Sequence, residues 1–133
     1  MKKIEHIGIA VKDLEASNAI YEKLLGVSSY KKEEVVSENV MTSFFKIGQS
    51  KIELLQATSK DSAIHKFIEK KGEGFHHIAF SVSDIEFETK RLISEGFKPL
   101  MEKPKKGADN KLVMFFHPKT TGGMLVELCQ EIK

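Results

Sequence analysis

Two histidines and two glutamates recur at matching places in the two halves of this sequence of 133 residues. The string His6-Ile-Gly-Ile-Ala-Val near the N-terminus is matched by His77-Ile-Ala-Phe-Ser-Val, an offset of 71 residues (77 − 6). Later in each half, Glu53 in Ile-Glu-Leu-Leu-Gln is matched by Glu127 in Val-Glu-Leu-Cys-Gln, an offset of 74 residues (127 − 53). A repeat of this kind indicates two copies of one structural unit. Each copy therefore supplies one histidine and one glutamate.

The chemistry that suits these four side chains is the binding of a divalent metal ion. Imidazole and carboxylate together favour borderline to hard ions such as Co²⁺, Ni²⁺, Mn²⁺ or Zn²⁺. A glutamate between apolar strand neighbours is costly to bury unless it is paired or bound to a cation. A single histidine at a strand start would usually be structural, but the repetition favours one shared site. Four protein ligands on an octahedral ion leave two positions for a chelating substrate.

Hydrophobic periodicity predicts the elements that position these residues in the first half. Apolar and small residues alternate over 4–11, which is typical of a half-buried strand with His6 on its less apolar face. Asp13 and Gly26 are suitable N-cap and C-terminal stop signals for a helix over 13–25, whose inner stripe is expected to contain Leu14, Tyr21, Leu24 and Leu25. Strands are then expected over 30–36, 40–47 and 50–56.

The second half repeats this order, after a short helix that joins the halves. We expect a strand over 76–82 and a helix over 84–95 with Ile85, Leu92 and Ile93 facing inward. Strands should follow over 97–103, 111–117 and 124–130, with loops over 104–110 and 118–123. The prediction is therefore an α+β fold with a single domain over 1–133. It comprises a βαβββ module 1–57, a connecting helix 58–73 and a βαβββ module 74–131, whose eight strands form one cupped sheet.

Composition narrows the function classes. The net charge is only +2, the charges are interspersed, and Arg91 is the sole arginine, so we expect no nucleic-acid partner. No apolar run is long enough to span a bilayer, so we expect no membrane partner either. One cysteine cannot form an internal disulfide, and residues 1–5 lack the apolar core of a signal peptide, so we expect none. These features favour a cytoplasmic location.

Several strings together resemble a known family. The histidine and glutamate pattern on a βαβββ repeat resembles the vicinal oxygen chelate (glyoxalase-like) superfamily. Within it, the chain is similar to the methylmalonyl-CoA epimerase family. The strings that carry this resemblance are His6-Ile-Gly-Ile-Ala-Val, Lys51-Ile-Glu-Leu-Leu, Gly74-Phe-His-His-Ile-Ala-Phe, Phe116-His-Pro-Lys and Gly122-Gly-Met-Leu-Val-Glu-Leu.

The resemblance implies a metal-dependent isomerase that interconverts (R)- and (S)-methylmalonyl-CoA. Its chemistry would be abstraction of the C2 proton, with the metal stabilising the enolate. The implied metal ligands are His6, Glu53, His77 and Glu127. The ion would be one divalent metal per chain, with Co²⁺ foremost and Mn²⁺, Ni²⁺ or Zn²⁺ open, and the substrate an acyl-CoA.

The resemblance leaves Glu127 as the first candidate for the catalytic base and Glu53 as the second. Some family members carry a carboxylate on the strand before the one with Glu53, but residues 40–45 here contain no acid. His117, Lys119, Gly122 and Gly123 would contact the substrate or only shape a turn. Because the sheet edges of such small modules need covering, we also expect a homodimer.

Two alternatives remain open from the sequence. A glyoxalase I (lactoylglutathione lyase) type enzyme would use the same ion, although a single arginine offers little to grip the carboxylates of glutathione. A metal-free small-molecule binding or resistance protein of the same fold would not need the four repeated ligand-type residues. His76 is expected to be a boundary residue facing away from His77, and Cys129 to be a packing residue.

Overall fold

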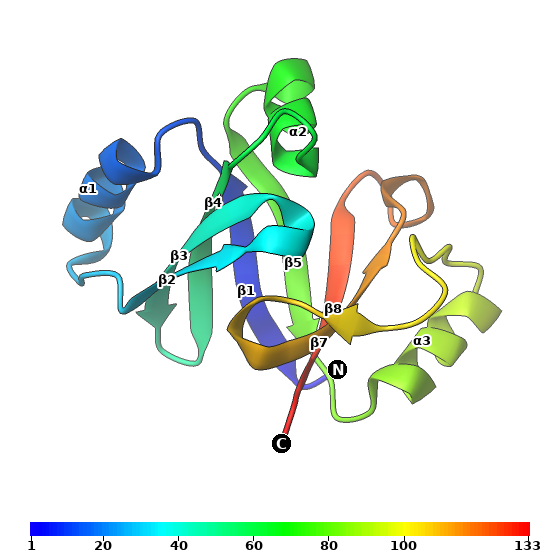
Figure 1. The fold of residues 1–133 in the computed structure, drawn as a ribbon. Helices are drawn as coiled ribbons and strands as arrows, with labels where there is room; N and C mark the ends of the chain where they lie inside the picture. The colour runs from blue at the N-terminus through cyan, green and yellow to red at the C-terminus, as the bar shows by residue number, and fades with distance from the viewer. The chain divides into compact units, whose positions relative to one another are not determined.

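The computed structural model describes all residues from 1 to 133 and has the predicted α+β class (Figure 1). The predicted order of two βαβββ modules is confirmed, and a helix lies between them in the sequence. The first module contains β1 (Lys3–Ala10), α1 (Leu14–Leu25), β2 (Lys31–Val35), β3 (Val40–Ile47) and β4 (Ser50–Ala57), and α2 (Ala63–Lys71) follows it. The second contains β5 (Gly74–Ser81), α3 (Ile85–Ser94), β6 (Lys105–Lys106), β7 (Lys111–Phe116) and β8 (Leu125–Glu131). Short 3-10 helices occur at Val36–Glu38 (η1), Ala108–Asn110 (η2) and Pro118–Thr120 (η3).

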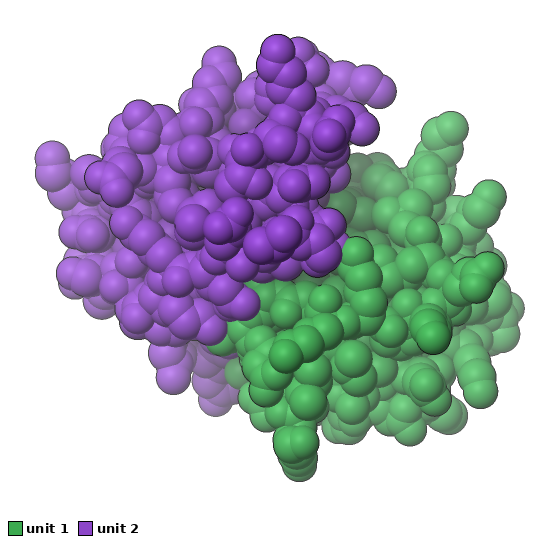
Figure 2. All heavy atoms as spheres, in the orientation of Figure 1, with its two compact units in different colours: residues 1–6, 77–133 green, residues 7–76 purple.

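The chain divides into two compact units whose limits differ from those of the modules (Figure 2). Unit 1 contains Met1–His6 and His77–Lys133, and unit 2 contains Ile7–His76. The limits fall inside β1 and inside β5. His6 of the first module therefore belongs to the same unit as His77 of the second.

Unit 2 has the strand order β2-β3-β4-β1, with antiparallel pairs β2/β3 and β3/β4. Helix α1 begins where the Asp13 carboxylate accepts the backbone N–H of Ala16 and ends at Gly26, whose φ is 73°. Leu14 on α1 packs against Phe45 and other apolar side chains of the sheet. The predicted inward position of Leu24 is wrong, because this side chain is 70% exposed. The other three residues of the predicted stripe, Leu14, Tyr21 and Leu25, do pack against the core.

Unit 1 has the strand order β1-β5-β8-β7-β6, with β5 parallel to β8 and β7 antiparallel to β8. Its core combines Ile85 at the start of α3 with Met114 on β7 and Leu128 on β8. The predicted inward position of Ile93 is wrong, because this side chain is 47% exposed, whereas Leu92, also predicted to face inward, packs against the core. The buried face of α3 is therefore narrower than the sequence indicated.

The predicted strand over 97–103 does not form. This segment makes one isolated bridge, between Pro99 and Phe116, and the strand β6 lies two residues later inside the predicted loop over 104–110. Pro99 and Pro104 at either end of the segment lack the N–H that a ladder needs, which explains why pairing is limited there.

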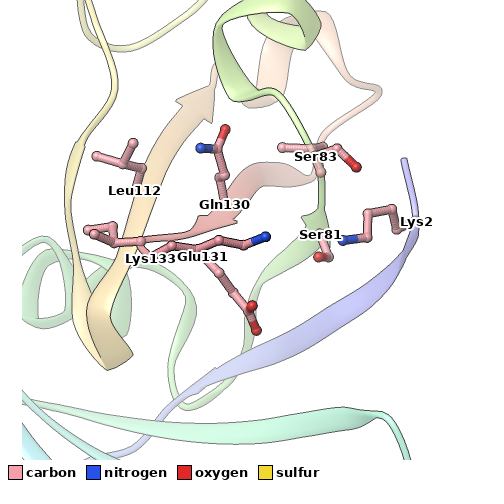
Figure 3. Close-up of a pocket in the computed structure, with 9 residues that line it drawn as sticks. Lys2, Ser81, Ser83, Leu112, Gln130, Glu131 and Lys133 are labelled. Carbon is pink, nitrogen blue, oxygen red and sulfur yellow. The ribbon is translucent and has the colours of Figure 1, made fainter.

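The repeat is also visible in how α1 and α3 begin. The side-chain oxygen of Gln56 accepts the backbone N–H of Leu14 at 2.6 Å, and that of Gln130 accepts the N–H of Ile85 at 2.7 Å. Each glutamine satisfies a backbone donor that a helix start otherwise leaves without a partner. Gln130 also lines a pocket of about 470 Å³ at the ends of β5 and β8 (Figure 3).

None of the helices has the length and apolar character needed to cross a membrane.

Candidate metal centre

Three of the four predicted metal ligands converge in unit 1. They are His6 on β1, His77 on β5 and Glu127 on β8. The two Nε2 atoms lie 3.0 Å apart, and Glu127 Oε1 lies 3.0 Å from His77 Nε2 and 3.3 Å from His6 Nε2. All three side chains are about 95% buried, with exposed fractions of 4%, 5% and 5%. The donor atoms thus form a small triangle shielded from solvent.

The pairing of β5 with β8 explains how two of these ligands meet. Glu127 lies beside Ala79 in the parallel register, and His77 is two residues before Ala79 on β5. Residues two apart on a strand share a face, so His77 and Glu127 are diagonal neighbours on one face of the pair. Ala79 is fully buried and has only a methyl side chain, which leaves room for both ligands beside it.

The dimensions of the donor triangle fit one divalent ion. Cis donors about 2.1 Å from an octahedral ion are about 3.0 Å apart, which is close to the three observed separations. Lone pairs directed at one point repel each other unless a proton or a cation lies among them. Two imidazoles and a carboxylate are a donor set that suits first-row divalent metals. The residues present therefore fit a divalent metal ion.

Glu5 supports this centre and was not predicted. Its Oε1 lies 2.8 Å from Nδ1 of His6, and both side chains are buried. With Nδ1–H donated to the Glu5 carboxylate, the lone pair of His6 is on Nε2, which faces the other two donors. Strict strand alternation places Glu5 on the opposite face from His6, so the sequence pattern did not predict this contact.

The repeat gave no help in finding Glu5. The matching residue in the second half is His76 (5 + 71), whose ring packs edge-on against Phe67 with centroids 4.9 Å apart. His76 belongs to unit 2, whereas His77 belongs to unit 1. The carboxylate behind the first histidine is therefore a departure from the internal symmetry.

The local charges favour the protonation states that metal binding requires. Burial alone would raise the pKa of Glu127, but the charges and hydrogen bonds of His6 and His77 outweigh it and hold this pKa far below its ordinary value. Burial is also the main reason why the pKa of His77 lies below its usual value of 6.5, although the hydrogen bond to Glu127 opposes that shift. An ionised carboxylate and a neutral imidazole are the forms that coordinate a metal.

Cys129 contacts the other oxygen of Glu127. Its Sγ lies 3.0 Å from Glu127 Oε2, and the thiol is 1% exposed among Ala79, Val113 and Phe115. The sequence predicted a packing role for this residue. The packing is present, but the thiol also donates a hydrogen bond to a metal-ligand candidate.

Glu53, the fourth predicted ligand, lies on β4 in unit 2. It is 5% exposed and is paired in register with Phe44 of β3. A carboxylate buried to this extent needs a compensating partner. Its role as a ligand or a base stays a prediction.

The predicted substrate-contact residues lie in the turn around η3. The Nδ1 atom of His117 accepts the backbone N–H of Lys119 at 3.1 Å, and the N–H of Gly123 donates to the carbonyl of Pro118 at 2.7 Å. Gly122 and Gly123 have φ values of 79° and 104°, which other residues rarely adopt. These contacts account for the turn, and a substrate role for the four residues stays a prediction.

The chain is similar to proteins of known fold and name. Residues 5–115 match the model of the Glyoxalase/Bleomycin resistance protein/Dioxygenase superfamily. The chain is 39% identical to the ethylmalonyl-CoA/methylmalonyl-CoA epimerase of Cereibacter sphaeroides, over 96% of this chain and 97% of that protein. It is 38% identical to the human mitochondrial methylmalonyl-CoA epimerase, over 96% of this chain and 73% of that protein.

A solved structure agrees with these relatives. A variant of the Streptomyces coelicolor methylmalonyl-CoA epimerase in complex with 2-nitronate-propionyl-CoA superposes with a TM-score of 0.95 at 33% identity. The superposition covers 100% of this chain and 99% of that chain.

Proposed function

The chain belongs to the Glyoxalase/Bleomycin resistance protein/Dioxygenase superfamily, and we propose that it is a metal-dependent epimerase that interconverts (R)- and (S)-methylmalonyl-CoA. The buried triangle formed by His6, His77 and Glu127 is the observation that supports metal dependence. The observation that carries the substrate is the similarity to epimerases named for it, over 96% of this chain. We also propose that residues 1–133 form a single domain.

The chemistry of such a reaction requires stabilised negative charge and two proton positions. A divalent ion bound here would supply positive charge beside the thioester and carboxylate oxygens of the substrate, which makes the C2 proton more acidic. His6 and His77 would hold that ion through their Nε2 atoms. Glu5 would keep the His6 ring in the required tautomer.

Glu127 and Glu53 are the proposed bases, in that order. Glu127 Oε1 is turned towards the two imidazoles and Oε2 accepts the thiol of Cys129, so the carboxylate would have to release one of these contacts to accept a proton. Its low pKa makes it a weak base, and it can accept a proton only from a strongly acidified carbon. Epimerisation needs a second proton position on the other face of C2, which we assign to Glu53.

The remaining parts of the proposal concern the ion, the substrate and the assembly. One divalent ion per chain is proposed, with Co²⁺ foremost and Mn²⁺, Ni²⁺ or Zn²⁺ as alternatives that the donor set also accepts. The substrate is an acyl-CoA, and His117, Lys119, Gly122 and Gly123 are proposed to contact it. A homodimer in the cytoplasm completes the proposal.

The test is incorporation of deuterium from D₂O at C2 of methylmalonyl-CoA. The Co²⁺-loaded protein should catalyse this exchange, and the same sample should give no lactoylglutathione from methylglyoxal and glutathione. Exchange that is absent from a sample with one ion per chain would contradict the epimerase proposal. Lyase activity in its place would identify the protein as a glyoxalase I type enzyme.

A further inference from the structure

The thiol of Cys129 is directed at the one oxygen of Glu127 that does not face the imidazoles. Sγ lies 3.0 Å from Oε2, and both side chains are buried in unit 1. An ionised carboxylate can only accept hydrogen bonds, so the thiol must be the donor.

The two oxygens of Glu127 therefore have different neighbours. Oε1 lies within 3.3 Å of both Nε2 atoms, whereas Oε2 faces the sulfur. The sulfur also lies within 4.8 Å of a carboxylate oxygen of Glu5 and a ring nitrogen of His6. The thiol thus lies next to Glu127 and close to His6 and Glu5.

We propose that Cys129 is a positioning residue that keeps Glu127 bound to the metal ion through Oε1 alone. By donating its S–H to Oε2, the thiol holds this oxygen away from the ion. Carboxylates can bind cations through one oxygen or through both, and the second mode occupies an additional coordination position. A chelating acyl substrate needs such positions. The proposal rests on the metal site proposed above and adds a device that keeps it open for the substrate.

Two substitutions separate the hydrogen bond from the packing. Cys129→Ser keeps a donor on a side chain of similar length, and Cys129→Ala removes the donor while preserving a small apolar side chain beside Ala79 and Val113. In the alanine variant Oε2 loses its donor and turns towards the ion. Catalytic efficiency should then fall by about tenfold, mainly through a higher KM, whereas the serine variant should stay within about threefold of the parent.

The decisive readout is the visible absorption spectrum of the Co²⁺-loaded protein, because it reports the number of ligands on the ion. The spectrum of Cys129→Ser should match the parent, and that of Cys129→Ala should change in band position and intensity. Superposable spectra for parent and Cys129→Ala would overturn the positioning role while leaving the metal site intact. A parent protein that binds no Co²⁺ would instead contradict the metal site itself.

A measurement on the unmodified side chain keeps the test valid if Cys129→Ala fails to fold. The infrared S–H stretching band of the parent protein should lie at the lowered frequency of a thiol that donates to a carboxylate. The band should remain after Co²⁺ is added, and Cys129→Ser serves as the blank. A band at the frequency of a thiol without an acceptor would refute the proposal.

Discussion

Replacing Glu5 with glutamine should weaken metal binding although Glu5 is not itself a ligand of the ion. The Glu5 carboxylate lies 2.8 Å from His6 Nδ1, a separation typical of a charge-assisted hydrogen bond. Both residues are 4% exposed, so water is poorly placed to replace the lost charge. Glu5→Gln keeps the shape of the side chain but removes the charge that fixes the tautomer of His6.

The size of the effect follows from what the substitution does to His6. Substitutions behind a metal-binding histidine typically weaken metal affinity by about 10-fold to 100-fold, or about 1.4 to 2.7 kcal/mol. We expect the upper end of this range for Glu5→Gln. The new amide can donate to Nδ1, and this would favour the tautomer in which Nε2 carries the proton and cannot coordinate.

The assay is competition for Co²⁺ between the protein and a chromophoric chelator at constant pH. Glu131→Gln is the matched control, because Glu131 is exposed at the end of β8 and its substitution removes the same charge. The control should keep the parent affinity. If Glu5→Gln, folded as judged by circular dichroism, also binds Co²⁺ within twofold of the parent, the assignment of Glu5 as the partner that orients His6 is wrong.

Three further predictions concern the same unit. His77→Ala should lose Co²⁺ in elemental analysis. Glu127→Gln should retain some Co²⁺ but lose deuterium exchange at C2. Exchange at the parent rate in Glu127→Gln would show that Glu127 is not the base. In chelator-treated protein, the lowered pKa of His77 means that the unfolded chain binds more protons than the native state below pH 6.5. The free energy of unfolding, measured in urea, should therefore fall as the pH drops through 6.5, and fall further below 4.5 as Glu127 protonates in the unfolded chain. A rise in stability over that range would contradict the assigned charges. Gln130→Leu should destabilise the protein by about 1 to 2 kcal/mol, because the N–H of Ile85 loses its acceptor, with Co²⁺ affinity unchanged; an unchanged urea midpoint would refute this role.

The internal repeat explains why the three residues of the candidate metal centre could be selected from the sequence. Matched strings identified His6, His77 and Glu127 without any knowledge of pairing, and strand alternation assigned them to the less apolar faces. Glu5 could not be found this way, because its contact with His6 departs from alternation and has no counterpart in the second half. The hydrogen bond of Cys129 depends on a side-chain rotamer, which a sequence pattern does not contain.

The errors in the fold have equally local causes. Over 97–103 apolar residues suggested a strand, but the prolines near its ends limit ladder pairing to a single bridge. Leu24 and Ile93 are adjacent in sequence to Leu25 and Leu92, which pack against the core, so each side chain is turned about 100° around its helix from the buried stripe. Periodicity gives the direction of a helix face but not how wide the buried part of that face is.

X-ray absorption at the cobalt edge of the Co²⁺-loaded protein tests the metal centre most directly. Two imidazole nitrogens should appear at about 2.1 Å from the ion in the parent protein. Any cobalt that remains in His77→Ala should show only one. A cobalt site without imidazole ligands, or one that keeps two in His77→Ala, would contradict the central role of His6 and His77.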